Sequence, residues 1–245
     1  IKVLLGPHAP YTCPDSYMEE VIALSHEIGA GIHMHLSETK GEVDTVIKAT
    51  GKTPIAHMHE LGLFYNGALA AHCVHVTEED MAIMRDNHVA VAHNPQSNLK
   101  LASGIAPVPE MVAAGITVGL GTDGSASNNN ADMLEEVRLA AMLHKGRLYD
   151  PKAVPAHMAW DMGTLEGAKA LGYDDLGLIK EGYRADITLY NTDQVHWMPR
   201  YHDISALVYS ANSADVETSI VAGKILMHNK ELLTIDEERL GFEIA

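Results

Sequence analysis

The chain has 245 residues, of which 47% are hydrophobic and 20% charged, and its formal net charge is −16 from 17 Lys and Arg against 33 Asp and Glu. This composition indicates a globular protein with a sizeable core, and the acidic balance excludes binding to nucleic-acid backbones by charge. No apolar run approaches the roughly 18 residues of a membrane span, so we expect neither a nucleic-acid partner nor a membrane partner.

Two cysteines, Cys13 and Cys73, form no CxxC pair and no disulfide framework, which favours a reducing cytoplasm. The first residue, Ile1, already lies in the apolar run IKVLLG, and the tail DEERLGFEIA has a helix-like pattern without a cap. We therefore expect a chain that lacks the front part of a longer fold.

Short apolar runs alternate with helical patterns in the first part of the chain. Strands are predicted at residues 2–5, 30–35, 68–72, 88–93 and 116–121. Helices are predicted at residues 15–28, 40–49, 55–62, 78–87, 107–114, 131–145 and 155–170, with Thr77 and Asp80 resembling a weakened capping box. Apolar strands separated by helices are typical of an α/β fold with a buried parallel sheet.

The pattern changes after about residue 172. Strands are predicted at residues 185–191, 204–210, 216–223 and 224–229, with no helices between them. We therefore expect part of a small, β-sandwich-like domain over residues 173–245. Five βα units of about 30 residues fill residues 1–172, whereas a closed (β/α)₈ barrel needs about 250 residues. Residues 1–172 are either a five-stranded open sheet or the last five units of a barrel.

Polar residues follow the predicted strands at the point where each strand ends. They are His8, then His33, His35 and Glu38, then His72, His93 and Asp123. In parallel α/β folds this edge of the sheet holds the active site. One such histidine is usually a core residue, but a set on consecutive strands points to a metal site for Zn²⁺, Fe²⁺ or Mn²⁺. Glu38, three residues after His35, is an acid/base candidate.

Other polar residues receive plainer interpretations. His33 is expected beside the site or in the core, and His57 and His59, at a predicted helix start, at the surface. His93 either contacts substrate or shapes the turn of the HNP sequence, and both readings stay open. The segment QSNLKL (96–101) has no G-x-S-x-G elbow around its serine, so no nucleophile is expected there.

Four longer segments are distinctive when taken together: HMHLSETKGEV, LAAHCVHVTEED, VAHNPQSNLKLASGIAPVPEM and GITVGLGTDGSASNNNADMLEEVRLAAMLHK. They resemble the amidohydrolase superfamily and, more narrowly, its 5-methylthioadenosine/S-adenosylhomocysteine deaminases. GLIKEGYRADITLYN resembles the segment by which such enzymes leave the barrel for a small β-domain. The resemblance covers almost the whole chain. It implies the C-terminal part of a TIM-type (β/α)₈ metal-dependent hydrolase barrel, about five βα units, with part of the β-domain.

The resemblance implies a role for each matching position. His35 and Asp123 match metal ligands, and Glu38 matches the acid/base that also contacts the substrate ring. His72 matches a catalytic histidine beside the metal. Asp123 also matches a residue that accepts the proton of water, and His8 and Asp123 match substrate-binding positions. One divalent metal is implied as the cofactor, with zinc first and iron or manganese as alternatives.

The implied function is hydrolytic deamination of a small adenine-containing molecule, namely S-adenosylhomocysteine, 5-methylthioadenosine or adenosine, with release of ammonia. A homo-oligomer is compatible with this function. Two alternatives stay open: guanine deaminase or N-heterocycle chlorohydrolase activity, and a truncated chain without activity. The second arises because the His-x-His ligand pair on the family's first strand has no match here. The signature H-x-E…P-C-x-x-C of the zinc nucleobase deaminases is absent.

Overall fold

The computed structural model describes residues 2–244, so Ile1 and Ala245 lie outside the described residues. The strands are β1 (Ile32–Leu36), β2 (Ala68–His72), β3 (Ala90–His93), β4 (Val118–Leu120), β5 (Ile187–Tyr190), β6 (Val216–Val221), β7 (Lys224–His228) and β8 (Glu231–Leu232). The helices are α1 (Asp15–Ile28), α2 (Lys40–Thr50), α3 (Pro54–Glu60), α4 (Glu78–Asp86), α5 (Pro95–Lys100), α6 (Val108–Ala113), α7 (Ser125–Asn128), α8 (Met133–Leu148), α9 (Ala156–Gly163), α10 (Leu165–Ala170), α11 (Asp203–Tyr209) and α12 (Glu237–Ile244). Two short 3₁₀ segments are also present, Val195–Trp197 and Ser213–Asp215.

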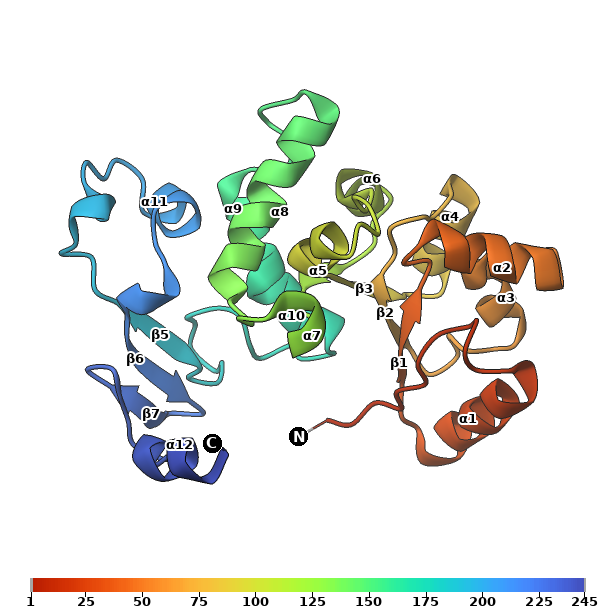
Figure 1. Ribbon diagram of the computed structural model, residues 1–245, viewed down its shortest axis with the longest axis horizontal. Coiled ribbons are helices and arrows are strands. Elements are labelled where there is room, and N and C mark those ends of the chain that lie inside the picture. Colours follow the sequence, from red (N-terminus) through yellow and green to blue (C-terminus); the bar gives the residue numbers. More distant parts are fainter. Residues whose placement is uncertain (1, 245) are drawn as a thin grey trace.

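The first sheet has four parallel strands in the order β1-β2-β3-β4 (Figure 1). Helices separate the consecutive strands along the chain, and parallel neighbours need such crossovers. The predicted α/β fold with a parallel sheet is therefore confirmed. No helix among residues 2–244 combines the length and the apolar character that crossing a membrane requires.

The register of this sheet separates its two faces. His35 is aligned with Ala71, Ala71 with Ala92, and Ala92 with Gly119, so one row across the sheet carries His35 and small residues. The neighbouring row, which includes Met34 and Val91, points to the opposite face because side chains alternate along a strand. That opposite face is the buried one.

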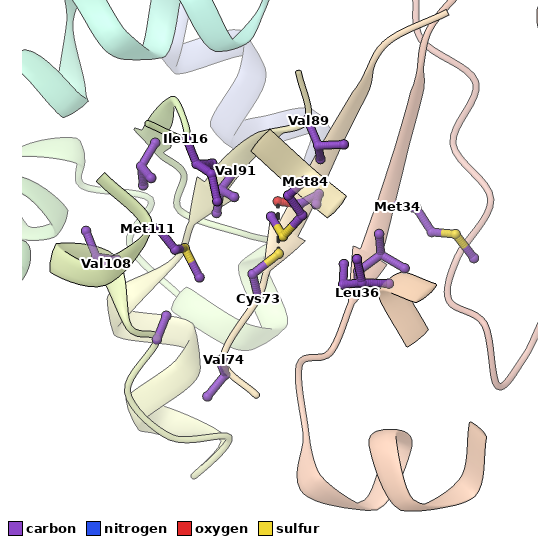
Figure 2. Packing of buried hydrophobic residues seen from close by; sticks show 14 of the residues in the cluster. Met34, Leu36, Cys73, Val74, Met84, Val89, Val91, Val108, Met111 and Ile116 are labelled. Atoms are coloured by element: carbon purple, nitrogen blue, oxygen red, sulfur yellow. Dashed lines mark hydrogen bonds between the residues drawn. The ribbon is translucent and has the colours of Figure 1, made fainter. Parts of the chain in front are cut away.

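The core lies between this buried face and the surrounding helices. Figure 2 shows Met84 of α4 beside Cys73 and Val91, with Met111 of α6 farther along the same layer. Met84, Val91 and Met111 are fully buried. Their burial is the main source of stability for the sheet.

The second sheet is antiparallel, in the order β5-β6-β7-β8. Figure 1 shows α8, α9 and α10 between the two sheets. The predicted strands at residues 185–191, 216–223 and 224–229 correspond to β5, β6 and β7. The division of the chain at residue 172 stays a prediction.

The predicted strand at residues 204–210 is wrong, because this segment forms the helix α11. A short apolar run does not distinguish a buried strand from a buried helix. Here the helix packs beside α8, whose Arg138 donates hydrogen bonds to the backbone oxygens of Val208 and Ala211 near the helix end. These contacts satisfy carbonyl groups that a helix C-terminus leaves free.

The predicted strand at residues 2–5 is also wrong, so the predicted five βα units reduce to four strands. Leu5 forms an isolated parallel bridge to Ile32, and Val3 is largely exposed. Pro7 follows two residues later and has no N–H to extend the ladder.

Among the predicted helices, residues 155–170 form two helices instead of one. They break at Thr164, whose backbone is not helical (φ −129°, ψ −91°). The capping box at Thr77 and Asp80 is confirmed, with both reciprocal hydrogen bonds formed.

The layer shown in Figure 2 predicts how stability depends on one buried methionine. Replacing Met111 by alanine leaves a cavity in the core and should lower the free energy of unfolding by about 2–5 kcal/mol. Met142→Ala is the matched control, since that side chain is 46% exposed, and it should change the free energy by less than about 0.5 kcal/mol. Urea unfolding curves measure both values, and equal losses would contradict the assignment of Met111 to the core.

Candidate metal centre

Unusual backbone conformations occur where three strands of the parallel sheet end. Ser37 (φ 53°), His72 (φ 72°) and Asp123 (φ 62°) have left-handed backbones at or just after β1, β2 and β4. Non-glycine residues adopt this region uncommonly. Each such residue costs on the order of 1–3 kcal/mol and persists only where its surroundings hold it. Similar conformations also occur in other turns of the chain, but here three of them follow strands that end at the same edge of the sheet.

The structure brings three side chains together at this edge. His35, His72 and Asp123 each offer one ligand atom, and these atoms lie within 4.8 Å of one another. The rings of His35 and His72 are stacked, with centroids 5.3 Å apart. Two imidazoles and a carboxylate form a donor set that suits Zn²⁺, so the chemistry of these residues fits the expected metal.

The ring of His35 is oriented by a backbone carbonyl. Its Nδ1 lies 2.7 Å from the backbone oxygen of His8. A carbonyl oxygen only accepts, so Nδ1 carries the proton and Nε2 keeps a free lone pair. The ring of His8 is exposed, lies with its centroid 5.0 Å from that of His35, and contacts Thr12 Oγ1 at 2.7 Å.

The ring of His72 is buried and held by an amide. Its Nδ1 lies 2.8 Å from Oδ1 of Asn98 and 3.5 Å from Nδ2 of Asn94. The shorter contact decides the arrangement, because Nδ1 cannot donate to Asn98 and accept from Asn94 at once. Nε2 of His72 then faces Oε2 of Glu38 at 3.8 Å.

The carboxylate of Asp123 accepts two hydrogen bonds. Ser97 Oγ donates to Oδ2 at 2.7 Å, and the N–H of Gly124 donates to Oδ1 at 2.7 Å. Burial raises the pKa of Asp123, but these hydrogen bonds outweigh burial, so the pKa lies below its usual value. Asp123 is therefore a carboxylate at neutral pH, in the form that a metal or a proton requires.

Glu38 lies at the rim, next to a buried carboxyl group that holds its backbone. Glu42 accepts from the N–H groups of Ser37 (2.9 Å) and Glu38 (2.7 Å). Burial raises the pKa of Glu42 despite these hydrogen bonds. Oε1 of Glu38 accepts from Ser103 Oγ at 3.1 Å. Glu38 is thus held by two hydrogen bonds, one from its backbone N–H and one to its side-chain Oε1.

A cavity of about 560 Å³ opens on the face of the sheet that carries His33, His35 and Asp123. Small residues, Ala71 and Gly121 among them, line it. A Cβ atom at Gly121 would lie 2.5 Å from Oδ1 of the buried Asn94, so a larger residue there would require Asn94 to move. The exposed His33 is a cavity-lining residue and not a core residue.

Two further predictions about histidines are resolved by burial. His93 is completely buried and packs on His144 with ring centroids 5.4 Å apart, so it does not face the cavity. Burial lowers the pKa of His93 to about 3 and that of His144 to about 4, and both rings are neutral. His59 is exposed as predicted, but His57 is buried and contacts Asp15 Oδ1 at 2.9 Å.

Several residues that support the site were missed at the level of sequence. Glu136 of α8 is buried and accepts from the N–H of Gln96 (3.1 Å) and from Nδ2 of Asn128 (2.6 Å). It therefore ties the start of α5 to the end of α7, the short helix that follows Asp123. A buried glutamate on an otherwise amphipathic helix could have signalled such a tie.

Comparisons with known proteins agree with this geometry. Residues 1–226 match the Amidohydrolase family. A 5-methylthioadenosine/S-adenosylhomocysteine deaminase of Dictyoglomus thermophilum is 55% identical over 243 residues, which are 99% of this chain and 57% of that protein. The chain thus spans little more than half of that relative.

Two similar solved structures contain zinc. An adenosine deaminase from Xanthomonas campestris with bound zinc superposes with a TM-score of 0.94 at 35% identity, over 98% of this chain and 55% of that one. Atrazine chlorohydrolase from Arthrobacter aurescens, complexed with zinc, has a TM-score of 0.89 at 29% identity, over 98% and 53%.

The buried Glu136 predicts a pH dependence of stability. Burial raises its pKa from 4.5 to about 7 in the folded protein. Because the pKa is raised on folding, the stability that the Glu136 carboxyl group contributes is fully present below a pH of about 4.5. It is lost as the pH rises to about 7. Glu136→Gln should therefore lose less stability than the wild type between pH 5 and pH 8, in urea unfolding curves at both values. Glu135→Gln is the matched control, and identical pH profiles for Glu136→Gln and wild type would contradict this assignment.

Proposed function

Since this chain belongs to the amidohydrolase family, we propose that it carries the metal centre of a hydrolytic deaminase for adenine-containing nucleosides. The substrates would be S-adenosylhomocysteine, 5-methylthioadenosine or adenosine. The observation that carries the proposal is the convergence of His35, His72 and Asp123 within 4.8 Å, with Glu38 3.8 Å from His72. The deaminase of D. thermophilum and the adenosine deaminase of X. campestris support the substrate class.

His35 and Asp123 would hold one divalent metal, zinc in the first place, with His72 close enough to reach the metal or the attacking water. When bound, such a metal lowers the pKa of its water ligand to about 7. The zinc in both neighbouring structures supports this choice. The sheet β1–β4 would then be part of a (β/α)₈ barrel over residues 1–172, and residues 173–245 part of a small β-domain.

The proton transfers follow from where the carboxylates lie. Asp123, ionised at neutral pH, takes one proton from the attacking water as its oxygen bonds to C6 of adenine. Glu38 protonates the neighbouring ring nitrogen, and the proton on Asp123 passes to the amino group, which leaves as ammonia. The remaining hydroxyl proton returns to Glu38 as the C6 carbonyl forms. Water and adenine are thus converted into hypoxanthine and ammonia, and both carboxyl groups are restored.

The exposed His8 lies beside the candidate ligand His35 and would contact the substrate. Its ring is free on the side away from Thr12 Oγ1, which occupies Nδ1. His33 lines the cavity and lies two residues before His35 on β1. His33 would therefore contact a substrate ring inside the cavity, and His8 would contact the substrate from beside His35.

The first test concerns the substrate. The intact protein, loaded with zinc, should convert S-adenosylhomocysteine into its inosyl product, seen as a fall in absorbance near the adenine maximum with ammonia released in equal amount. Guanine and a chlorinated triazine are the competing substrates, the latter because of the chlorohydrolase neighbour. Turnover of either one, without any change in S-adenosylhomocysteine, would overturn the assignment to adenine compounds.

The second test concerns Glu38. Glu38→Gln removes the proton donor while keeping the shape, and should lower kcat by about 10²–10⁴-fold. Its zinc content should equal that of the wild type, because the role proposed for Glu38 is proton transfer and not ligation. Asp123→Ala, in contrast, should lose both zinc and activity. Full activity of Glu38→Gln would exclude Glu38 as the acid/base.

A further inference from the structure

We propose that residues 97–103 act as a positioning template, in which Ser97, Asn98 and Ser103 each hold one functional side chain of the site. The roles of those held side chains rest on the proposed function, but the template itself is a statement about hydrogen bonds. Ser97 holds Asp123, Asn98 holds His72, and Ser103 holds Glu38.

The three contacts are short, and the residues that make them from this segment are buried. Ser97 Oγ lies 2.7 Å from Asp123 Oδ2, Asn98 Oδ1 lies 2.8 Å from His72 Nδ1, and Ser103 Oγ lies 3.1 Å from Glu38 Oε1. Ser97 and Asn98 are fully buried, and Ser103 is 5% exposed. Buried polar groups of this kind are strongly oriented, because water offers no competing partner.

The segment is itself held rigidly. Asn98 donates its N–H to Asn94 O at 3.0 Å, and Ser103 donates its N–H to Asn98 O at 2.9 Å. Nε2 of His75 contacts Ser103 O at 2.8 Å. The hydrogen bond from the N–H of Gln96 to Glu136 of α8 anchors the residue immediately before this segment. One rigid piece of chain therefore determines the relative positions of three side chains that come from three other parts of the sequence.

Each contact also selects a chemical form. Asn98 Oδ1 accepts from His72, which places the proton on Nδ1 and leaves the lone pair of Nε2 for a metal or water. Ser97 donates to Oδ2 of Asp123 and stabilises its carboxylate. Ser103 donates to Oε1 of Glu38, so the other oxygen, which faces His72 at 3.8 Å, is the one that carries a mobile proton.

The placement of Asn98 is not explained by its own hydrogen-bonding needs. Its Nδ2 is buried and has no hydrogen-bond partner among residues 2–244. A buried amide placed only for structural reasons would be expected to satisfy its donor as well as its acceptor. In the observed orientation, the Asn98 side chain forms the hydrogen bond to His72 and leaves its own Nδ2 without an acceptor.

The first experiment reads the tautomer of His72 directly. ¹⁵N NMR of the intact, metal-free protein should show the Nδ1–H form in the wild type and in Ser25→Ala. Ser25 is the matched control, because this buried serine donates only to Ala30 O, far from the site. Asn98→Leu, which has similar volume and no acceptor, should populate the Nε2–H form and lower the affinity for Zn²⁺ by about 10–100-fold in a chelator competition.

The second experiment separates positioning from packing at Ser97. Ser97→Thr keeps the hydroxyl, while Ser97→Val has the same shape without it. The threonine variant should bind Zn²⁺ at least about 10-fold more tightly than the valine variant, and neither should alter the tautomer of His72. This pair decides the question even where Asn98→Leu fails to fold.

Clear outcomes would overturn the template. One is a Nδ1–H tautomer and a zinc affinity within about two-fold of wild type in Asn98→Leu; the other is equal zinc affinity in the Ser97→Thr and Ser97→Val variants. Both readouts need no substrate. A protein that fails to deaminate S-adenosylhomocysteine would therefore remove the proposed function and leave the template standing. If instead the Asn98 and Ser97 variants are fully active and bind zinc as the wild type does, the template is overturned and the proposed function stands.

Discussion

The site depends on one constraint, the common alignment of the carboxyl ends of the parallel strands. The register places His35, Ala71, Ala92 and Gly119 in one row. Because the strands run in the same direction, the residues that follow them meet at a single edge, where His72 also lies. Apolar burial on the opposite face fixes this register, since a shift of one residue would exchange the two faces. Packing on one side of the sheet thus determines the chemistry on the other.

The two histidines of the candidate metal centre are oriented in the same way, although the groups that hold their Nδ1 atoms differ. A backbone carbonyl holds Nδ1 of His35, and a side-chain amide holds Nδ1 of His72. Both rings therefore present Nε2, one from β1 and one from the end of β2. Together with the ionised Asp123, this arrangement offers two imidazole nitrogens and one negative oxygen before any ligand binds. Preorganisation of this kind reduces the reorganisation that binding would otherwise require.

Sequence reasoning succeeded where chemistry follows strand ends and failed where it depends on tertiary contacts. His35, His72 and Asp123 could be placed at one edge because apolar runs locate the ends of strands, although their roles stay predictions. The segment 96–101 was considered only as a possible nucleophile setting, because nothing local reveals which distant groups the side chains of residues 97–103 contact. The strand predicted at residues 204–210 became α11, since its apolar run is too short to indicate a period. His57 was likewise missed, because its partner Asp15 lies 42 positions away.

The left-handed backbone at His72 and Asp123 affects which residues can replace them during evolution. Asp and His are among the few residue types, apart from glycine and asparagine, that tolerate such a conformation. At His72 and Asp123 the backbone therefore restricts substitution independently of any ligand. β-Branched residues are strongly disfavoured in this conformation, although Val154 adopts it elsewhere in the chain, whereas Asp, Asn and His, which can bind a metal, are enriched in it. At these two positions, the residue types that the backbone favours overlap with the residue types that bind a metal. Selection for backbone conformation and selection for metal binding therefore act in the same direction.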